Sequence, residues 1–445
     1  MVGGLLRIVN RMAEFRRAQP AKLLARVATQ GLARDSALSF MFFGLTLGLN
    51  MGTGVLVARE LGAQGRGELT AIMNVPALAT AVFALGCGQA AAYHLARHPH
   101  DGGRLIGTWL VILLPTAAVS ILLVEGAIPA LFAEQTAATE RLARLYALTL
   151  VLGLSAELLT GVVLGDQDFI YFNVIRIVPP LGTAIAYVGL WLTGHFTVSS
   201  ALAINAALGL VLFAVTAVRP LRRHRIRGPD RRLARSTAWY GIRAHSTNFL
   251  GVINGRLDLL IMPAFLTASL VGRYAVATNL SWIVVTVGGA LSSLVLPASA
   301  ARAGVAARRT VLRSLYATVA VSVAIATALG VISGLAIKVL YGPGFAGSVE
   351  PLRIMLPGCV LYAAAMVLAS GLNAENRPFT AAVTQLPGVL ITVIALPLFL
   401  WTGGITAAAI ISTVAYTAVF VAALILYRQA TGLPWRSFVR EPGAP

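Results

Sequence analysis

Long apolar stretches, separated by short polar segments, recur from one end of the sequence to the other. Two examples are LIGTWLVILLPTAAVSILLV (105–124) and AIISTVAYTAVFVAALILY (409–427). A helix of about 20 apolar residues crosses a hydrocarbon layer roughly 30 Å thick. The pattern therefore predicts a chain built almost entirely of membrane-spanning helices. Twelve such helices are expected, over 37–57, 69–95, 105–124, 142–164, 174–193, 200–218, 239–265, 274–297, 314–337, 352–371, 379–401 and 405–427.

Composition supports the prediction of an all-α integral membrane protein. Of the 445 residues, 58% are hydrophobic and 11% charged, and the mean hydropathy is +0.81. Soluble domains have about a quarter of their residues charged. The two cysteines, Cys87 and Cys359, lie in apolar segments without metal-ligand spacing, so we expect both to be packing residues and predict no metal site.

The charged residues predict the orientation of the chain. The formal net charge is +19, and arginines are concentrated before residue 36 and in RPLRRHRIRGPDRRLAR (219–235). Basic loops face the cytoplasm, so both termini are expected there. The same charges predict contact with anionic phospholipid headgroups and not with nucleic acid. Residues 1–35 are typical of a basic amphipathic helix on the inner leaflet, with a disordered basic tail as the alternative.

A weak internal repeat divides the chain into two halves. A shift of about 207 residues brings GRGEL (65–69) onto GRYAV (272–276), with further matches in the same order. Each half, 36–218 and 236–428, holds six predicted helices, and an even number makes the repeats parallel. The arginine-rich segment 219–235 is then a cytoplasmic linker, and 429–445 a cytoplasmic tail.

The stretch NGRLDLLIM (254–262) places Arg256 and Asp258 inside the seventh predicted helix. A charge at the centre of a membrane helix costs roughly 2.5–3.5 kcal/mol, so such residues are usually paired or functional. Two positions apart on a helix, these side chains point about 200° away from each other and cannot pair. A helical wheel gives two polar stripes, which predicts a helix that lines a cavity and not lipid. The stripes are Arg243, Thr247, Asn254 and Asp258, and His245, Asn248 and Arg256.

These residues define the candidate site. Arginine guanidinium groups suit a diphosphate, while an ionised carboxylate would repel it. For Asp258 and for Glu157, in the fourth predicted helix, a structural role and a role in ion coupling or gating both remain open. For Arg256 a substrate-facing role and a structural pair remain open. The candidate substrate-binding residues are Arg243, His245, Asn248, Asn254 and Arg256.

Several motifs resemble those of the Wzx-type polysaccharide flippases, a branch of the multidrug/oligosaccharidyl-lipid/polysaccharide (MOP) exporter superfamily. They are VARELGAQGRGELTAIM, GRLDLLIMPAFLTASLVGRYAVATNL, VLYGPGFAGSVEPLRIM and ASGLNAENRPFTAA, within a resemblance covering about residues 36–428. The resemblance implies a V-shaped, two-lobe fold like that of the MATE transporters. It also implies a cationic cavity and the transfer of undecaprenyl-diphosphate-linked oligosaccharides from the inner to the outer leaflet by alternating access. Polysaccharide polymerases and ligases are then candidate partners.

Other functions are weighed against this one. An enzyme is disfavoured because the loops are short and carry no catalytic constellation. A cation-coupled multidrug exporter is disfavoured because the first predicted helix offers only Asn50 in place of a coupling carboxylate. A peptidoglycan-precursor (lipid II) flippase remains the closest alternative. We expect no cofactor, with proton coupling, Na+ coupling or the membrane potential as alternative energy sources.

Overall fold

A computed structural model describes residues 44–300 and 305–435, and these residues are helical with short connections. The contacts divide the chain into two compact units, residues 1–50 and 51–445. In the first unit, the described residues 44–50 are helical. The helix packing described in the following paragraphs is that of the second unit, residues 51–445. The predicted amphipathic segment 1–35 and residues 436–445 of the predicted tail lie outside the described residues.

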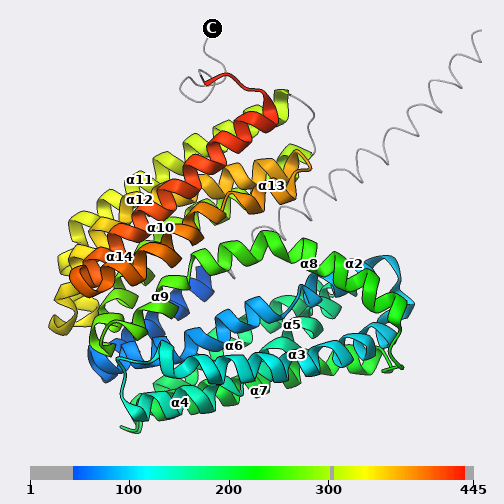
Figure 1. Cartoon of the computed structure of the whole chain (residues 1–445), viewed down its shortest axis with the longest axis horizontal. Helices are drawn as coiled ribbons and strands as arrows, with labels where there is room; N and C mark the ends of the chain where they lie inside the picture. Colours follow the sequence, from blue (N-terminus) through cyan, green and yellow to red (C-terminus); the bar gives the residue numbers. More distant parts are fainter. Residues whose placement is uncertain (1–43, 301–304, 436–445) are drawn as a thin grey trace, which may run out of the picture. The chain divides into compact units, whose positions relative to one another are not determined.

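The helices follow one another in chain order, and no strand occurs among the described residues (Figure 1). The N-terminal half contains the first helix Gly44–Phe83, α2 (Cys87–Arg97), η1 (Pro99–Asp101), α3 (Gly102–Leu131), α4 (Ala137–Ala147), α5 (Leu150–Gly165), α6 (Phe169–Leu192) and α7 (Val198–Arg223). The C-terminal half contains α8 (Arg231–Asn254), α9 (Leu257–Ile261), η2 (Met262–Ala264), α10 (Ala268–Ala300), α11 (Val305–Tyr341), η3 (Pro343–Ser348), α12 (Val349–Ala374), α13 (Pro378–Val383) and α14 (Leu386–Thr431).

The described residues contain eight helices that are long and apolar enough to cross a membrane, or nine when the bent pair Gly44–Phe83 and Cys87–Arg97 is one span. Two of the longest helices are interrupted by a glycine in the left-handed region: Gly62 has φ +64° and Gly404 has φ +53°. These glycines lie near the predicted boundaries between the first two and the last two helices. The total of twelve spans stays a prediction.

Two sets of helices form the body of residues 51–445. In the C-terminal set, α10, α11, α12 and α14 pack side by side around a core that includes Tyr274, Cys359 and Tyr416 (Figure 1). In the N-terminal set, α2 packs on α5, and α5 packs on α3, α6 and α7. Only 11% of the apolar window of α6 is buried in the protein, so most of that helix presents apolar side chains outward, as a membrane helix does.

The segment predicted as the linker 219–235 is largely helical. α7 continues through Arg223 and α8 begins at Arg231, so only residues 224–230 are irregular. This short segment is held against the start of α3, where Arg227 N–H donates to Gly103 O at 3.0 Å and Asp230 N–H donates to the Thr108 hydroxyl at 3.0 Å. Asp230 then caps α8 by accepting hydrogen bonds from two backbone N–H groups, and these bonds lower the pKa of its carboxyl.

The two halves meet at a reciprocal backbone contact. A Cβ on Gly67 would lie 1.7 Å from Ala268 O, and a Cβ on Gly272 would lie 2.0 Å from Ala63 O. Ala63 and Ala268 take equivalent places in this contact, as do Gly67 and Gly272, and both sets of equivalent positions are 205 residues apart in the sequence. The repeated GR motifs therefore contact each other, offset by two residues from the alignment that the sequence suggests.

Side chains extend this junction on either side of the glycines. Arg59 caps the end of α11 by donating to Leu340 O at 2.8 Å and to Val339 O. The amide of Gln135 donates to Pro263 O at 3.0 Å and to Leu266 O at 2.8 Å. The junction thus depends on main-chain carbonyl groups of the C-terminal half.

Gly67→Ala should destabilise this junction, because the new Cβ has no room and the two segments must move apart. Overpacking of this kind costs about 1–3 kcal/mol. We expect a lower melting temperature for the full-length protein in detergent. Gly126→Ala in α3 is the matched control, because no atom lies within 4 Å of a Cβ there. Equal melting temperatures for the two variants would contradict a tight junction.

Candidate functional site

The predicted seventh helix, 239–265, is broken in its second half. α8 begins earlier, at Arg231, and ends at Asn254; Gly255 and Arg256 form a turn before the short helix α9. Arg256 has φ −138° and ψ −5°, outside the helical region. A Cβ on residue 255 would lie 2.7 Å from the Trp282 ring, so glycine allows this close approach. The prediction of one continuous helix with two unbroken polar stripes was therefore wrong.

α8 differs from its neighbours in being polar. Among the described residues, α8 is not one of the helices that are apolar enough to span a membrane. It packs against α2 and α3 of the N-terminal set and against α13 and α14 of the C-terminal half. A polar helix is stable within a bilayer only when protein or water surrounds it. Its position among helices of both halves meets that requirement.

Arg256 lies at the break with its side chain exposed. Its carbonyl oxygen accepts a hydrogen bond of 3.0 Å from the Asn74 side chain, which ties the turn to the first helix. Its neighbours Gly255 and Leu257 are buried. Among the described residues the guanidinium group forms no hydrogen bond and no close ion pair with a carboxylate, although it interacts electrostatically with Asp258. The group is therefore positioned by its backbone and available to an anion.

Asp258 is buried, with an exposed fraction of 3%. Its carboxylate accepts a hydrogen bond of 2.6 Å from the Tyr274 hydroxyl and one of 2.8 Å from Leu259 N–H. The Tyr274 hydroxyl also lies 2.9 Å from the Ser412 hydroxyl. One carboxylate thus connects α9 to α10 and α14, and the Arg256 guanidinium interacts with it electrostatically without a hydrogen bond.

Asn254 is buried next to this network and does not face an opening. Its amide donates to the Gln385 side-chain oxygen at 3.1 Å, and the same oxygen accepts from the Tyr362 hydroxyl at 3.2 Å. The contact holds the end of α8 against α12 and the start of α14. The geometry therefore assigns Asn254 a packing role and not the cavity position that the sequence suggested.

His245 and Glu157 lie near each other on α8 and α5. The His245 Nε2 atom is 2.6 Å from Ala81 O, and the Glu157 carboxylate interacts electrostatically with the imidazole. A Cβ on Gly88 would lie 2.9 Å from the Glu157 Oε1 atom, so the carboxylate faces α2. The two titratable groups, assigned by the sequence to different roles, form one cluster with α2.

The remaining predicted residues lie apart from these groups. Arg243 is exposed on α8, with its guanidinium 5.9 Å from the centre of the Trp239 ring. Asn248 belongs to α8, but its side chain lies outside the described part of the structure. The structure therefore separates the seven candidates into several places along α8, α9 and α5. No group of three or more His, Cys, Asp or Glu side chains among the described residues could hold a metal ion.

Sequence reasoning missed three polar partners, Tyr274, Gln385 and Ser412. Each lies in an apolar segment, and a polar residue in such a segment is the one feature of the sequence that could have marked it as a hydrogen-bonding partner. Their pairing depends on how helices far apart in the chain pack, which the sequence pattern does not encode.

The arrangement of apolar helices with a polar helix between two halves is that of a multi-pass membrane protein. The sequence model of the family described as polysaccharide biosynthesis protein matches residues 56–350. The chain belongs to this polysaccharide biosynthesis family. No match was found among curated proteins.

Solved structures share the fold. The lipid II flippase MurJ in an inward closed conformation matches with a TM-score of 0.73 and 13% identity, over 91% of this chain and 89% of MurJ. An inward-facing multidrug resistance MATE transporter of the MOP superfamily has a TM-score of 0.70 and 14% identity, over 88% and 96%. A MOP superfamily transporter from Pyrococcus furiosus, described as having a binding pocket of reverse polarity, has a TM-score of 0.56 and 13% identity, over 88% and 92%. The predicted MATE/MOP-like fold is confirmed.

Tyr274→Phe should destabilise the protein, because a buried carboxylate then loses a hydrogen-bond donor. The expected loss is about 1–3 kcal/mol, measured as a lower melting temperature. Tyr146→Phe is the control, since no hydrogen bond of that hydroxyl is seen in the described structure. In a double-mutant cycle with Asp258→Asn, the two changes should be non-additive. Additive effects would mean that Asp258 and Tyr274 do not act as a pair.

Proposed function

We propose that the protein is a flippase that moves undecaprenyl-diphosphate-linked oligosaccharides from the inner to the outer leaflet of the bacterial plasma membrane. The transport step is alternating access, with the two halves opening in turn to either side. Membership of the polysaccharide biosynthesis family supports a glycan-linked substrate. The likeness to MurJ and MATE structures supports a transport function. The product serves cell-surface polysaccharide synthesis, with polymerases and ligases as partners.

The observation that carries this proposal is the exposed guanidinium of Arg256 at the break between α8 and α9. A permanent positive charge that forms no close ion pair or hydrogen bond is costly inside a membrane unless an anion or water meets it. A diphosphate accepts paired N–H bonds from an arginine fork. Arg256 is thus suited to hold the charged end of the lipid carrier.

The carboxylates act away from the substrate. Asp258 keeps the segment after the break fixed to α10 and α14, so that Arg256 stays in place. The Glu157–His245 cluster, between the N-terminal set and α8, is the candidate for proton coupling. A rival energy source is the membrane potential, worth about 2.3 kcal/mol per charge for each 100 mV when an anion leaves a negative interior.

Leaflet location of lipid-linked sugars tests the function in cells. Cells depleted of the protein are converted to spheroplasts and treated with a membrane-impermeant glycan-modifying probe. We expect lipid-linked oligosaccharides to accumulate and to stay shielded from the probe. Normal labelling would contradict the proposal. Shielding confined to the peptidoglycan precursor would instead identify a lipid II flippase.

Arg256→Gln tests the assigned residue in vesicles that contain the purified protein and a fluorescent, diphosphate-linked isoprenyl sugar. Loss of a charged hydrogen bond should slow transfer about tenfold or more, with an unchanged melting temperature. Arg256→Lys keeps the charge and should retain part of the rate. Arg313→Gln, an exposed arginine on α11, is the charge-matched control. A normal rate for Arg256→Gln at normal abundance would remove this residue from the substrate site.

A further inference from the structure

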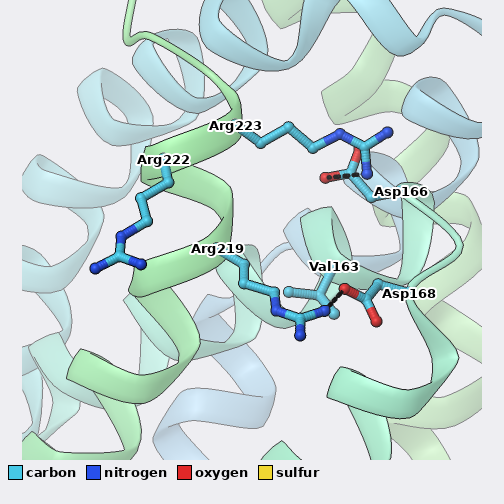
Figure 2. A pocket seen from close by; sticks show the side chains of 6 residues that line it. All are labelled: Val163, Asp166, Asp168, Arg219, Arg222 and Arg223. Atoms are coloured by element: carbon cyan, nitrogen blue, oxygen red, sulfur yellow. Dashed lines mark hydrogen bonds and ion pairs between the residues drawn. The ribbon is translucent and has the colours of Figure 1, made fainter.

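A second group of charged residues surrounds a cavity of about 250 Å³ at one end of the N-terminal set. α5 ends there at Gly165, α6 begins at Phe169, and the last turn of α7 ends at Arg223. Because three membrane helices begin or end at this level, the cavity lies at the height of lipid headgroups, on the side that the arginines predict to be cytoplasmic. The residues lining it are Val163, Asp166, Asp168, Arg219, Arg222 and Arg223 (Figure 2).

Two of the arginines are already neutralised. Arg219 pairs with Asp168 and stacks over the Tyr171 ring, with its guanidinium 4.4 Å from the ring centre. Burial would raise the pKa of Asp168, but the Tyr171 N–H and Arg219 together lower it, so the carboxylate stays ionised. Arg223 lies 3.8 Å from Asp166, which His224 holds more closely at 2.9 Å.

Arg222 is the arginine in excess. Its side chain is exposed and points away from both aspartates (Figure 2). No carboxylate pairs with it among the residues that the structure describes. Three arginines and two aspartates leave one positive charge in the cavity. Arg219 and Arg223 extend toward the aspartates, so Arg222 is the arginine that is left to meet an anion (Figure 2).

The surroundings of the cavity distinguish a lipid from a soluble ion. Val163 lines the apolar side of the cavity. Close in sequence to the lining residues Asp168 and Arg222, the apolar side chains of Phe169, Ile170 and Leu221 are exposed, with fractions of 59%, 80% and 44%. Apolar side chains at the end of a membrane helix contact acyl chains. A ligand with one negative charge and an attached hydrocarbon chain therefore matches both parts of the site.

We propose that this cavity binds the phosphate group of an anionic phospholipid in the adjacent leaflet, with Arg222 as the principal ligand. A phosphodiester carries one negative charge, which balances the single excess charge of the site. The lipid would link the α5–α6 turn to the end of α7. This site is separate from the substrate site proposed above and does not depend on it.

Melting temperatures of the full-length protein in detergent test the proposal. Short-chain phosphatidylglycerol should raise the melting temperature, because a ligand that binds only the folded state stabilises it. Short-chain phosphatidylcholine and inorganic phosphate at the same concentrations should have little effect. Equal stabilisation by inorganic phosphate would assign a free-anion site in place of a lipid site. The absence of any shift with phosphatidylglycerol would overturn the proposal.

Arg222→Gln identifies the residue and should fold normally, because its side chain is exposed. We expect the apparent affinity for phosphatidylglycerol to fall about tenfold or more with the loss of a charge-assisted bond. Arg231→Gln, in the first turn of α8, removes the same charge outside the cavity and should keep the wild-type affinity. Native mass spectrometry should find one fewer bound lipid in Arg222→Gln only. An equal loss in both variants would indicate diffuse attraction and contradict a defined site.

Discussion

The hydrogen bond from Tyr274 to Asp258 is the interaction on which the candidate site depends. An ionisable side chain in an apolar protein interior is stable only when its polar atoms have partners. Tyr274 and Leu259 provide these partners, and Ser412 extends the network to α14. Because α9 is fixed in this way, the turn before it has a defined place, and Arg256 projects from that turn. The buried carboxylate thus positions the exposed guanidinium without contacting it.

The helical class of the protein and the places of most helices could be predicted from the sequence. Apolar runs are long, and turns such as those before α6 and α7 have polar residues that cap the next helix, Asp168 and Thr197. The break at Gly255 could not be predicted, because a single glycine in a helical pattern usually causes none. Here the close approach of Trp282, from α10, gives that glycine its role.

The candidate site was predicted in part. Polarity alone identified Arg256 and Asp258, and the structure gives the two residues different environments, one exposed and one buried. The helical wheel placed Asn254 on a polar stripe predicted to face a cavity. In the structure its side-chain amide donates a hydrogen bond to Gln385, which comes from a distant segment. Likewise, the arginines of α7 looked like a solvated linker until α7 proved to continue through them. In each case a contact between distant segments decided the outcome.

The reciprocal contact of Gly67 and Gly272 is a junction of bare backbone. At these two positions the contact is made by backbone atoms and not by side chains. The alternating access proposed above would require the two halves to turn against each other, and at these two glycines such a turn would break no side-chain ion pair. The polar contacts of Arg59 and Gln135 around it then set how firmly one orientation is held.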